Sequence, residues 1–246
     1  MSEGRIQRLF VPDDLYEGQT VALAPQQAHY VGGVIRLPVG GAILLFNGRD
    51  GEWRARRAEG GKREVRLIAE EATRPQDPPG LIDYAFAPLK HARLDYMIQK
   101  AVEMGVARIS PVITRRTQVN RVNLERMEAN AIEAAEQCGL LSLPTLDDPQ
   151  TLDRWLADMG DDRLLVFCDE EAPLADPLAA LRGGPAGRPV VLIGPEGGFA
   201  PEERQLLERH ARCVRLSLGP RILRADTAAI VALSLVQATL GDLGTV

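Results

Sequence analysis

The sequence is poor in the residues from which metal centres and disulfide frameworks are built. Its 246 residues include three cysteines, which lie far apart without a Cys-x-x-Cys pair, and three histidines without a His-Glu-x-x-His motif. This distribution predicts no metal site and no disulfide framework. Each cysteine (Cys138, Cys168 and Cys213) is expected to be a small buried apolar residue.

The sequence also has no apolar run near the length of about 18 residues that a membrane span requires. Its first residues, MSEGRIQRLFVPDD, lack the apolar segment of a secretory signal. With 45% hydrophobic and 26% charged residues, the composition is typical of a globular protein of one large or two modest domains. The expected location is the cytoplasm, without membrane contact.

The motifs of the common nucleotide-binding and hydrolase folds are missing. The sequence has no Gly-x-x-x-x-Gly-Lys-[Ser/Thr] loop, no early Gly-x-Gly-x-x-Gly turn and no Gly-x-Ser-x-Gly elbow. The familiar nucleotide folds are therefore disfavoured. A nucleotide-like cofactor that is held mainly by backbone groups is still compatible with the sequence.

The net charge of −5 at first argues against a nucleic-acid partner, but the charge is unevenly distributed. Residues 49–66 contain seven basic and four acidic side chains, and residues 88–126 have a net charge of +5. The stretch 127–177, in contrast, has a net charge of −11. Because phosphate contacts depend on the local field, basic faces for RNA can coexist with an acidic total. The alternative is a solvated surface of mixed sign.

The first 73 residues show short strand-like runs that are broken by turns, namely RLFV, TVALA, AILLFNG, EWRARRA and REVRLIAE. The NGRDGE stretch at 47–52 predicts a hairpin, because Asn, Asp and Gly accept the positive φ of tight turns. Short strands without a long helix predict a small β-barrel. The Pro-rich TRPQDPPG at 73–80 is typical of a linker.

From residue 81 onward, strand and helix patterns alternate. Strands are expected at 81–89, 107–113, 163–170, 189–194 and 213–219, and helices at 92–105, 123–139, 148–159, 201–211 and 227–241. Pro149 suits the first turn of the third helix. The alternation predicts an α/β domain with a mainly parallel sheet.

Three strand ends in this region are candidates for a ligand site. They are VFCDEEAP at 166–173, LIGPEGGF at 192–199 and LSLGPRILRADTAA at 216–229. In an open α/β sheet, ligands bind beyond the carboxyl ends of the strands, and glycine lets the backbone approach a ligand closely. A lone glycine turn is usually only a tight connection. Two in succession, the second with Arg221 and Arg224, favour a ligand.

LIGPEGGF followed by LSLGPRILRADTA resembles the paired C-terminal motifs of the RsmE-type uridine-N3 methyltransferases of small-subunit ribosomal RNA, in the SPOUT superfamily. The resemblance continues through MIQKAVEMGVARISPVITRR and AIEAAEQCG. At the N-terminus it includes QRLFV and HYVGGVIRLPVGGAILLFNG. It therefore covers nearly the whole chain.

The resemblance implies a PUA-like β-barrel for RNA binding over 1–73. A SPOUT α/β methyltransferase domain with a C-terminal trefoil knot would follow over 81–246. It implies a homodimer that binds S-adenosylmethionine (SAM) and methylates uridine N3 in 16S ribosomal RNA of the small subunit. The three strand ends would then surround the cofactor.

Site residues follow from the same resemblance. The cofactor-binding residues would be Gly194, Pro195, Glu196, Gly197, Gly198, Leu218, Gly219, Ile222, Leu223 and Arg224. The catalytic residues would be Arg224 first, then Arg221, with Glu196 at the site entrance, and the guanidinium would stabilise charge on the uracil carbonyl oxygens. The RNA-binding residues would be Arg8, Arg36, Arg54, Arg56 and Arg57.

Several roles have alternatives. Glu196 would either accept backbone N–H bonds within its turn or contact substrate, and Arg221 and Arg224 would otherwise bind phosphates or a dimer partner. For Asp226, the position just before an apolar helix favours a role as the helix N-cap over a role as the base. The rival functions are a SPOUT methyltransferase for a ribose 2′-hydroxyl or transfer RNA, and a non-catalytic RNA-binding assembly factor.

The chain departs from the family pattern at three positions. Ala200 stands where Ser would cap the next helix, Asp226 replaces a glutamate, and Leu140 replaces a basic residue expected near the RNA. Glu202 and Glu203 would offset part of the missing cap, because carboxylates are favourable near a helix N-terminus.

Overall fold

The computed structural model describes residues 6–61, 64–119 and 121–243. The chain forms two compact units. The first unit consists of Met1–Pro78 and Ala135–Leu143, and the second of Pro79–Ala134 and Pro144–Val246. In the described part of the chain, no helix combines the length and apolar character that crossing a bilayer requires.

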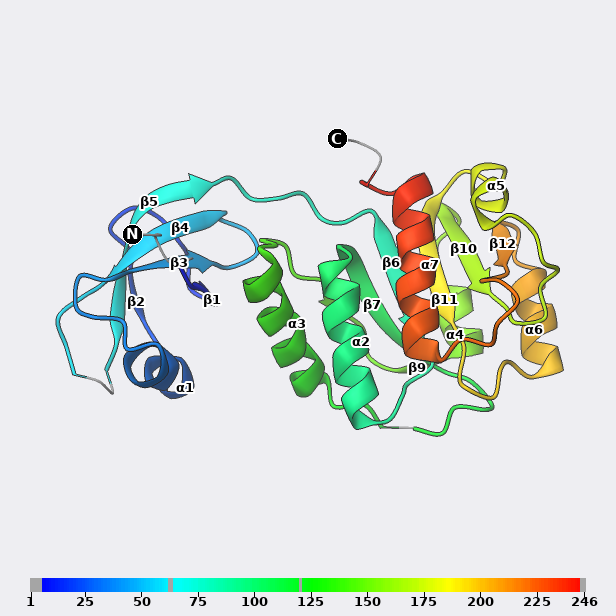
Figure 1. Ribbon diagram of the computed structural model, residues 1–246, viewed down its shortest axis with the longest axis horizontal. Helices are drawn as coiled ribbons and strands as arrows, with labels where there is room; N and C mark the ends of the chain where they lie inside the picture. Colours follow the sequence, from blue (N-terminus) through cyan, green and yellow to red (C-terminus); the bar gives the residue numbers. More distant parts are fainter. Residues whose placement is uncertain (1–5, 62–63, 120, 244–246) are drawn as a thin grey trace. The chain divides into compact units, whose positions relative to one another are not determined.

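The first unit contains a five-stranded sheet in the order β1-β3-β4-β5-β2 (Figure 1). Its strands are β1 (Arg8–Phe10), β2 (Thr20–Ala22), β3 (Ala42–Phe46), β4 (Glu52–Arg57) and β5 (Arg66–Arg74). The pair β1–β3 is parallel and the other pairs are antiparallel. A short helix, α1 (Pro25–His29), and a π-helical turn (Tyr30–Val34) lie between β2 and β3. The sheet fits the strand pattern of the sequence, whereas closure into a PUA-like barrel stays a prediction.

The hairpin at 47–52 joins β3 to β4, as its sequence predicts. The Asn47 side-chain oxygen accepts N–H bonds from Arg49 (3.1 Å) and Asp50 (2.9 Å). Gly48 and Gly51 have φ angles of 81° and 80°. The backbone N–H of Leu15 and the side chain of Asn47 donate to the Asp50 carboxylate and lower its pKa. The turn is thus fixed by side-chain acceptors as well as by glycine.

The end of helix α3 (Leu124–Cys138) belongs to the first unit. The backbone N–H of Phe10 donates to Glu136 Oε1 (2.9 Å), Arg74 Nη1 donates to the Gly139 carbonyl (2.9 Å), and the backbone N–H of Leu141 donates to Asp77 Oδ2 (3.3 Å). Ala135–Leu143 therefore lies outside the compact second unit, although it falls within the predicted domain 81–246. The domain limits 1–73 and 81–246 stay a prediction.

The second unit is built on a seven-stranded parallel sheet in the order β12-β10-β11-β6-β7-β8, with β9 paired to β7. Its strands are β6 (Ile82–Phe86), β7 (Val106–Ile113), β8 (Thr145–Leu146), β9 (Gln150–Thr151), β10 (Arg163–Cys168), β11 (Arg188–Ile193) and β12 (Cys213–Leu216). The interiors of β6, β10 and β11 are buried on both faces, which explains their continuous apolar sequences. The predicted α/β class is confirmed.

Helices cover both faces of this sheet. They are α2 (His91–Glu103), α3 (Leu124–Cys138), α4 (Leu152–Asp158), α5 (Pro177–Arg182), α6 (Pro201–Glu208) and α7 (Ala225–Leu240). Helix α7 contacts α2, α5 and β11, and α2 and α7 lie side by side in Figure 1. On the other face, Leu152 and Trp155 of α4 and Leu207 of α6 share a buried cluster with Phe167 and Leu192 of the strands.

Three local predictions are wrong. Pro149 precedes strand β9 and not a helix, because residues 150–151 pair with Val112 and Ile113 of β7 and α4 begins only at Leu152. Helix α5 was not predicted; it begins at Pro177, where Asp176 caps the N–H of Leu178 (2.9 Å). Asp226 is not an N-cap, because Arg224 holds that position and Asp226 lies in the first turn of α7.

Glu203 replaces the missing cap at the start of α6. Its Oε2 accepts the Ala200 N–H (2.9 Å) and its Oε1 accepts the Arg115 N–H (2.8 Å), while the residue is only 5% exposed. The carboxylate thereby joins α6 to the segment that follows β7. The compensation expected from the charges of Glu202 and Glu203 near the helix N-terminus stays a prediction.

Glu203→Gln should destabilise the protein, because a buried amide NH₂ would face a backbone donor. Leaving such groups unsatisfied costs about 1–3 kcal/mol. The free energy of unfolding is measured by urea denaturation, with Glu202→Gln as the control, since Glu202 is exposed and pairs with Arg115 on the surface. Equal stabilities of the two variants would contradict the role assigned to Glu203.

Candidate functional site

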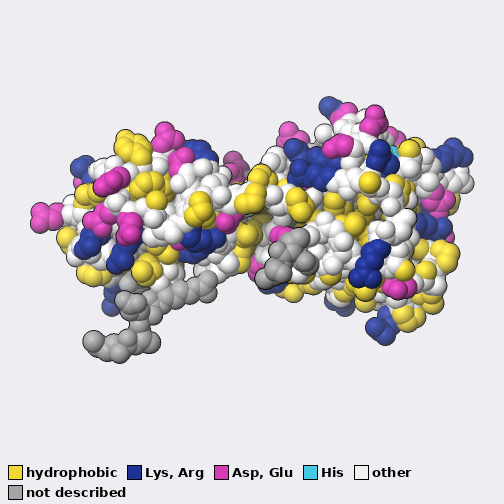
Figure 2. All heavy atoms as spheres, turned by 90° about the horizontal axis from the view of Figure 1, so that it is seen from above, with side chains coloured by type: hydrophobic (Ala, Val, Ile, Leu, Met, Phe, Trp, Pro, Cys, Tyr) yellow, Lys and Arg dark blue, Asp and Glu magenta, His cyan; other side chains and the backbone are white. Residues whose placement is uncertain are grey.

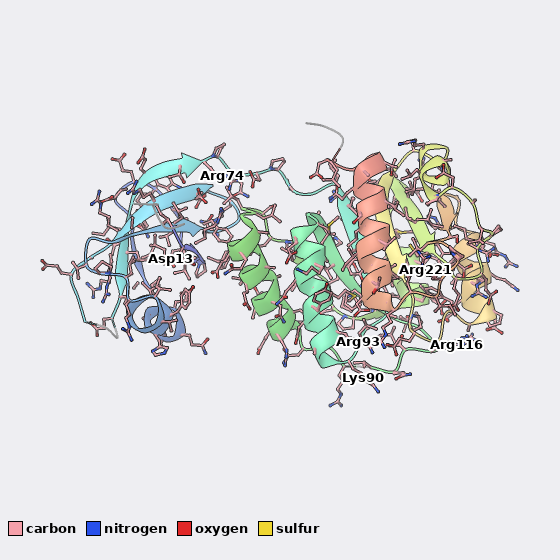
Figure 3. The ribbon with its side chains drawn as sticks, viewed as in Figure 1. Asp13, Arg74, Lys90, Arg93, Arg116 and Arg221 are labelled. Carbon is pink, nitrogen blue, oxygen red and sulfur yellow. The ribbon has the colours of Figure 1, made fainter. Side chains whose placement is uncertain are left out.

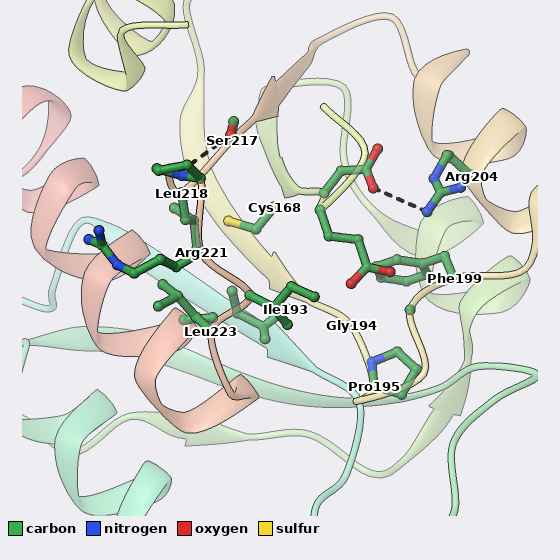
Figure 4. A pocket seen from close by; sticks show the side chains of 17 residues that line it. Cys168, Ile193, Gly194, Pro195, Phe199, Arg204, Ser217, Leu218, Arg221 and Leu223 are labelled. Carbon is green, nitrogen blue, oxygen red and sulfur yellow. Dashed lines mark hydrogen bonds and ion pairs between the residues drawn. The ribbon is translucent and has the colours of Figure 1, made fainter. Parts of the chain in front are cut away.

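A cavity of about 150 Å³ lies at the carboxyl ends of β10, β11 and β12 (Figure 4). We call it the strand-end cavity. All three strand ends proposed from the sequence contribute to its lining, with residues 168–170 after β10, residues 193–195, 198 and 199 after β11, and residues 217–223 after β12.

The loop after β10 is fixed by a buried carboxylate. Asp169, whose side chain is 1% exposed, pairs with Arg215 of β12 (2.6 Å) and with Arg204 of α6 (3.2 Å). Its Oδ1 also accepts the N–H of Glu171 (3.1 Å). Asp169 therefore connects the first loop to the elements that adjoin the other two.

The loop after β11 needs glycine at two positions. A Cβ on Gly194 would lie 2.4 Å from Cε2 of Phe199, and a Cβ on Gly198 would lie 2.4 Å from Oε1 of Glu170. Gly198 also has a φ of +67°, and its N–H donates to the Pro195 carbonyl (2.9 Å). Gly197 has no such constraint, since its nearest neighbour would be Arg116 Cδ at 3.7 Å.

The loop after β12 presents backbone and apolar side chains. Gly219 has a φ of +100°, a Cβ added there would meet no atom within 4 Å, and its N–H donates to Ser217 Oγ (3.4 Å). Leu218 and Leu223 add half-buried apolar surface, whereas Ile222 is 91% exposed. An apolar side chain so exposed at the edge of a cavity is available to pack against a ligand.

Cys168 lies in the cavity wall but is not a nucleophile at neutral pH. Burial, and secondarily the neighbouring Asp169 charge, raises the pKa of its thiol to about 12. The thiol therefore stays neutral, in line with the apolar role expected for Cys168. For Cys138 the expectation of a buried residue is wrong, because this residue is exposed at the end of α3. Among residues 6–61, 64–119 and 121–243, no group of three or more His, Cys, Asp or Glu side chains is placed to hold a metal ion.

The structure brings together most of the predicted cofactor-binding residues. Those in the lining are Gly194, Pro195, Gly198, Leu218, Gly219, Ile222 and Leu223, and Arg221 of the catalytic set joins them. Glu196, Gly197 and Arg224 are not in the lining. Arg224 is exposed at the N-cap of α7.

Glu196 has a partner that the sequence did not indicate. Its carboxylate pairs with Arg93 of α2, with side-chain exposures of 48% and 40%. The turn itself is closed by the Gly198 N–H and the Pro195 carbonyl, not by the Glu196 side chain. Arg93 could not be identified in advance, because it is about a hundred residues away in the chain.

The arginines predicted to bind RNA fall into two groups. Arg8 is 10% exposed and pairs with Glu52 (2.9 Å), and Arg57 is buried and donates to the Leu37 and Gly61 carbonyls. These two residues stabilise the first unit and are poorly placed to meet RNA. Arg36, Arg54 and Arg56 are exposed. Lys62 and Arg63 of the 49–66 cluster lie outside the described residues.

Charge alone does not single out an RNA surface. On the face that Figure 2 shows, basic and acidic side chains are interspersed. Arg56, for example, pairs with Glu70 (2.6 Å). This pattern is the mixed-sign surface that the sequence left open.

Four further lining residues, Asp169, Glu170, Phe199 and Ala228, lie within the three proposed strand ends but were not named as site residues, and Arg204 lies outside them. Asp169 and Glu170 stand directly after an apolar strand, and this position was a usable signal. Arg204 gave no signal, because an arginine within a polar helix such as α6 is ordinary.

Comparison with known proteins places this geometry in context. Residues 76–237 match the model of the RNA methyltransferase domain family. A ribosomal RNA small subunit methyltransferase E of Rickettsia conorii is 32% identical over 232 residues, covering 94% of each chain.

Two solved structures cover nearly the whole chain. A Legionella pneumophila protein in complex with bound SAM has a TM-score of 0.83 at 33% identity, covering 98% of this chain and 100% of that one. A ribosomal RNA small subunit methyltransferase E of Neisseria gonorrhoeae bound to S-adenosyl methionine has a TM-score of 0.83 at 29% identity, covering 97% and 100%. Because it is 32% identical to the Rickettsia conorii protein over 94% of both chains and matches the RNA methyltransferase domain over more than half of its length, the chain belongs to the ribosomal RNA small subunit methyltransferase E family.

Proposed function

We propose that this protein is a SAM-dependent methyltransferase that modifies N3 of a uridine in 16S ribosomal RNA. The observation that carries the proposal is the strand-end cavity, which is lined by the loops after β10, β11 and β12. Two similar proteins have been solved with SAM bound. The uridine N3 position is the finer part of the proposal and rests on the resemblance of the two C-terminal motifs.

The residues in the cavity fit the cofactor. The two glycine-containing loops at 194–198 and 218–223 expose backbone groups, and Ile193, Leu218 and Leu223 supply apolar surface. Glu170 is exposed at the cavity and has no ion pair among the described residues, so its charge is available to a cationic ligand. Asp169, in contrast, is occupied by its two arginines.

When bound, SAM supplies a sulfonium methyl group that is already strongly electrophilic. The chain's own task is therefore mostly to position the uracil and to stabilise the charge left when N3–H loses its proton. Arg221 lines the cavity and is the better placed guanidinium for the carbonyl oxygens, ahead of Arg224. No residue is assigned as the base.

Three further features belong to the proposal. The first unit would be the PUA-like RNA-binding barrel, with Arg36, Arg54 and Arg56 as its exposed cations. Arg36 has a φ of 51°, an unusual conformation for a side-chain-bearing residue that is often found at functional sites. Residues 1–73 would bind the RNA, and residues 81–246 would hold the cofactor and carry out the methyl transfer. Ribosomal RNA as substrate agrees with the predicted cytoplasmic location.

A homodimer and a C-terminal trefoil knot are also proposed. Helix α7 is apolar around most of its circumference, and Ile230, Val231 and Leu235 are only partly buried, which favours a partner surface. The chain leaves β11 and enters β12 on the far side of β10. This crossing supports a knotted path without establishing it.

The activity is tested by incubating the purified protein and SAM with unmodified 16S ribosomal RNA, both free and in small subunits. Nucleoside mass spectrometry should detect one methyl group on the uracil base at N3. Methylation of the ribose would contradict the assigned position, and absence of both cofactor binding and methylation would contradict the enzyme assignment.

Gly198→Ala should weaken SAM binding at least about tenfold, near 1.4 kcal/mol, because the added methyl requires a strained φ and displaces Glu170. Gly197→Ala is the matched control and should change the affinity less than about threefold, since its methyl meets only ordinary contacts. Calorimetric titration measures both. Equal effects of the two substitutions would remove the steric argument for the 194–198 loop.

Arg221→Ala should lower methyl transfer at saturating RNA about 10²-fold, the scale for loss of a preorganised electrostatic stabiliser. Its SAM affinity should fall much less, and Arg224→Ala should have the smaller effect on turnover because Arg224 lies outside the cavity. Single-turnover methylation assays separate the two. A larger loss for Arg224→Ala would restore Arg224 as the principal catalytic arginine.

A further inference from the structure

A second cavity, of about 290 Å³, lies in the same unit. We call it the basic cavity, and its polar lining consists of Lys90, Arg93, Arg116, Gln118 and Glu196. Pro195 lines both cavities. In Figure 3, Lys90, Arg93 and Arg116 lie along one edge of the unit, with Arg221 above them.

The basic cavity is electrostatically suited to an anion. Three cations face one carboxylate, and Lys90 has no ion pair among the described residues. Lys90 is also the N-cap of the 13-residue helix α2, which has no side-chain cap and no acidic residue in its first turn. The positive end of the α2 dipole therefore adds to the charge of the side chains.

The two arginines are attached to the turn that separates the cavities. Arg93 pairs with the carboxylate of Glu196, and Arg116 Nη1 donates to the Gly197 carbonyl (2.7 Å). Neither Glu196 nor Gly197 lines the strand-end cavity, whereas Pro195 and Gly198 of the same turn do. One short turn thus contributes residues to both the strand-end cavity and the basic cavity.

We infer that the basic cavity binds the phosphodiester backbone of the substrate RNA beside the nucleotide that is methylated, with Lys90, Arg93 and Arg116 as phosphate ligands. This inference rests on the proposed function, which supplies RNA as the polyanion. Glu196 keeps the Arg93 guanidinium in place, and a phosphate oxygen competes with the carboxylate for it. Glu196 is then a positioning residue and not a catalytic one.

The test measures binding of an in vitro transcribed 16S ribosomal RNA as a function of KCl concentration, at saturating SAM. Lys90→Ala and Arg93→Ala should each lower RNA affinity at least about fivefold and reduce the salt slope by about 0.7 to 0.9, the value for one lost phosphate contact. Arg182→Ala is the matched control, an exposed arginine that lines neither cavity. It should leave both quantities unchanged.

The Glu196→Gln substitution is expected to change the RNA affinity in the opposite direction. Removing the competing carboxylate should raise RNA affinity about threefold or more at low salt, whereas a role for Glu196 in holding substrate predicts a fall. SAM affinity, measured by calorimetry, should stay within about twofold of wild type in every variant and shows that each is folded.

Failure of this inference is distinguishable from failure of the proposed function. Suppose the wild type binds SAM and methylates the RNA. Lys90→Ala and Arg93→Ala variants that then bind RNA like Arg182→Ala overturn the inference alone, as does weaker RNA binding by Glu196→Gln. A wild type that neither binds SAM nor methylates RNA overturns the proposed function, and the inference with it.

Discussion

The carboxylate of Asp169 is the contact on which the strand-end cavity depends. It pairs with Arg204 of α6 and Arg215 of β12, and these elements adjoin the loops after β11 and β12. A carboxylate this deeply buried is tolerated only because both arginines and a backbone N–H compensate for lost hydration. The three loops therefore keep their mutual geometry through one side chain, although they are far apart in sequence.

Because Asp169 holds the three loops together, the wall of the strand-end cavity can consist largely of backbone. Gly194 and Gly198 are small because a ring and a carboxylate already occupy the space beside them. The same turn contains Glu196, which pairs with Arg93, and Gly197, whose carbonyl accepts a hydrogen bond from Arg116. The motif thus combines residues that shape one cavity with residues that organise the next.

Features governed by local chemistry could be predicted from the sequence. The Asn47 hairpin, the buried parallel strands and the meeting of three strand ends follow from turn preferences, hydrophobic pattern and sheet geometry. Contacts between distant segments could not. The partner of Glu196, the burial of Arg8 and the strand pairing that displaces Pro149 from a helix all depend on tertiary packing. The two-residue period of β4 does indicate that Arg57 shares the face of buried Ala55.

The inclusion of Ala135–Leu143 in the first unit has a consequence for the order of synthesis. The last strand of that unit, β5, ends at Arg74, but Glu136 and Gly139, which bond to Phe10 and Arg74, are made about 60 residues later. At the usual rate of translation this delay is roughly 3 to 12 seconds. During that interval the emerging sheet lacks these contacts, so the first unit completes its native contacts only after residues 79–134 of the second unit have been synthesised.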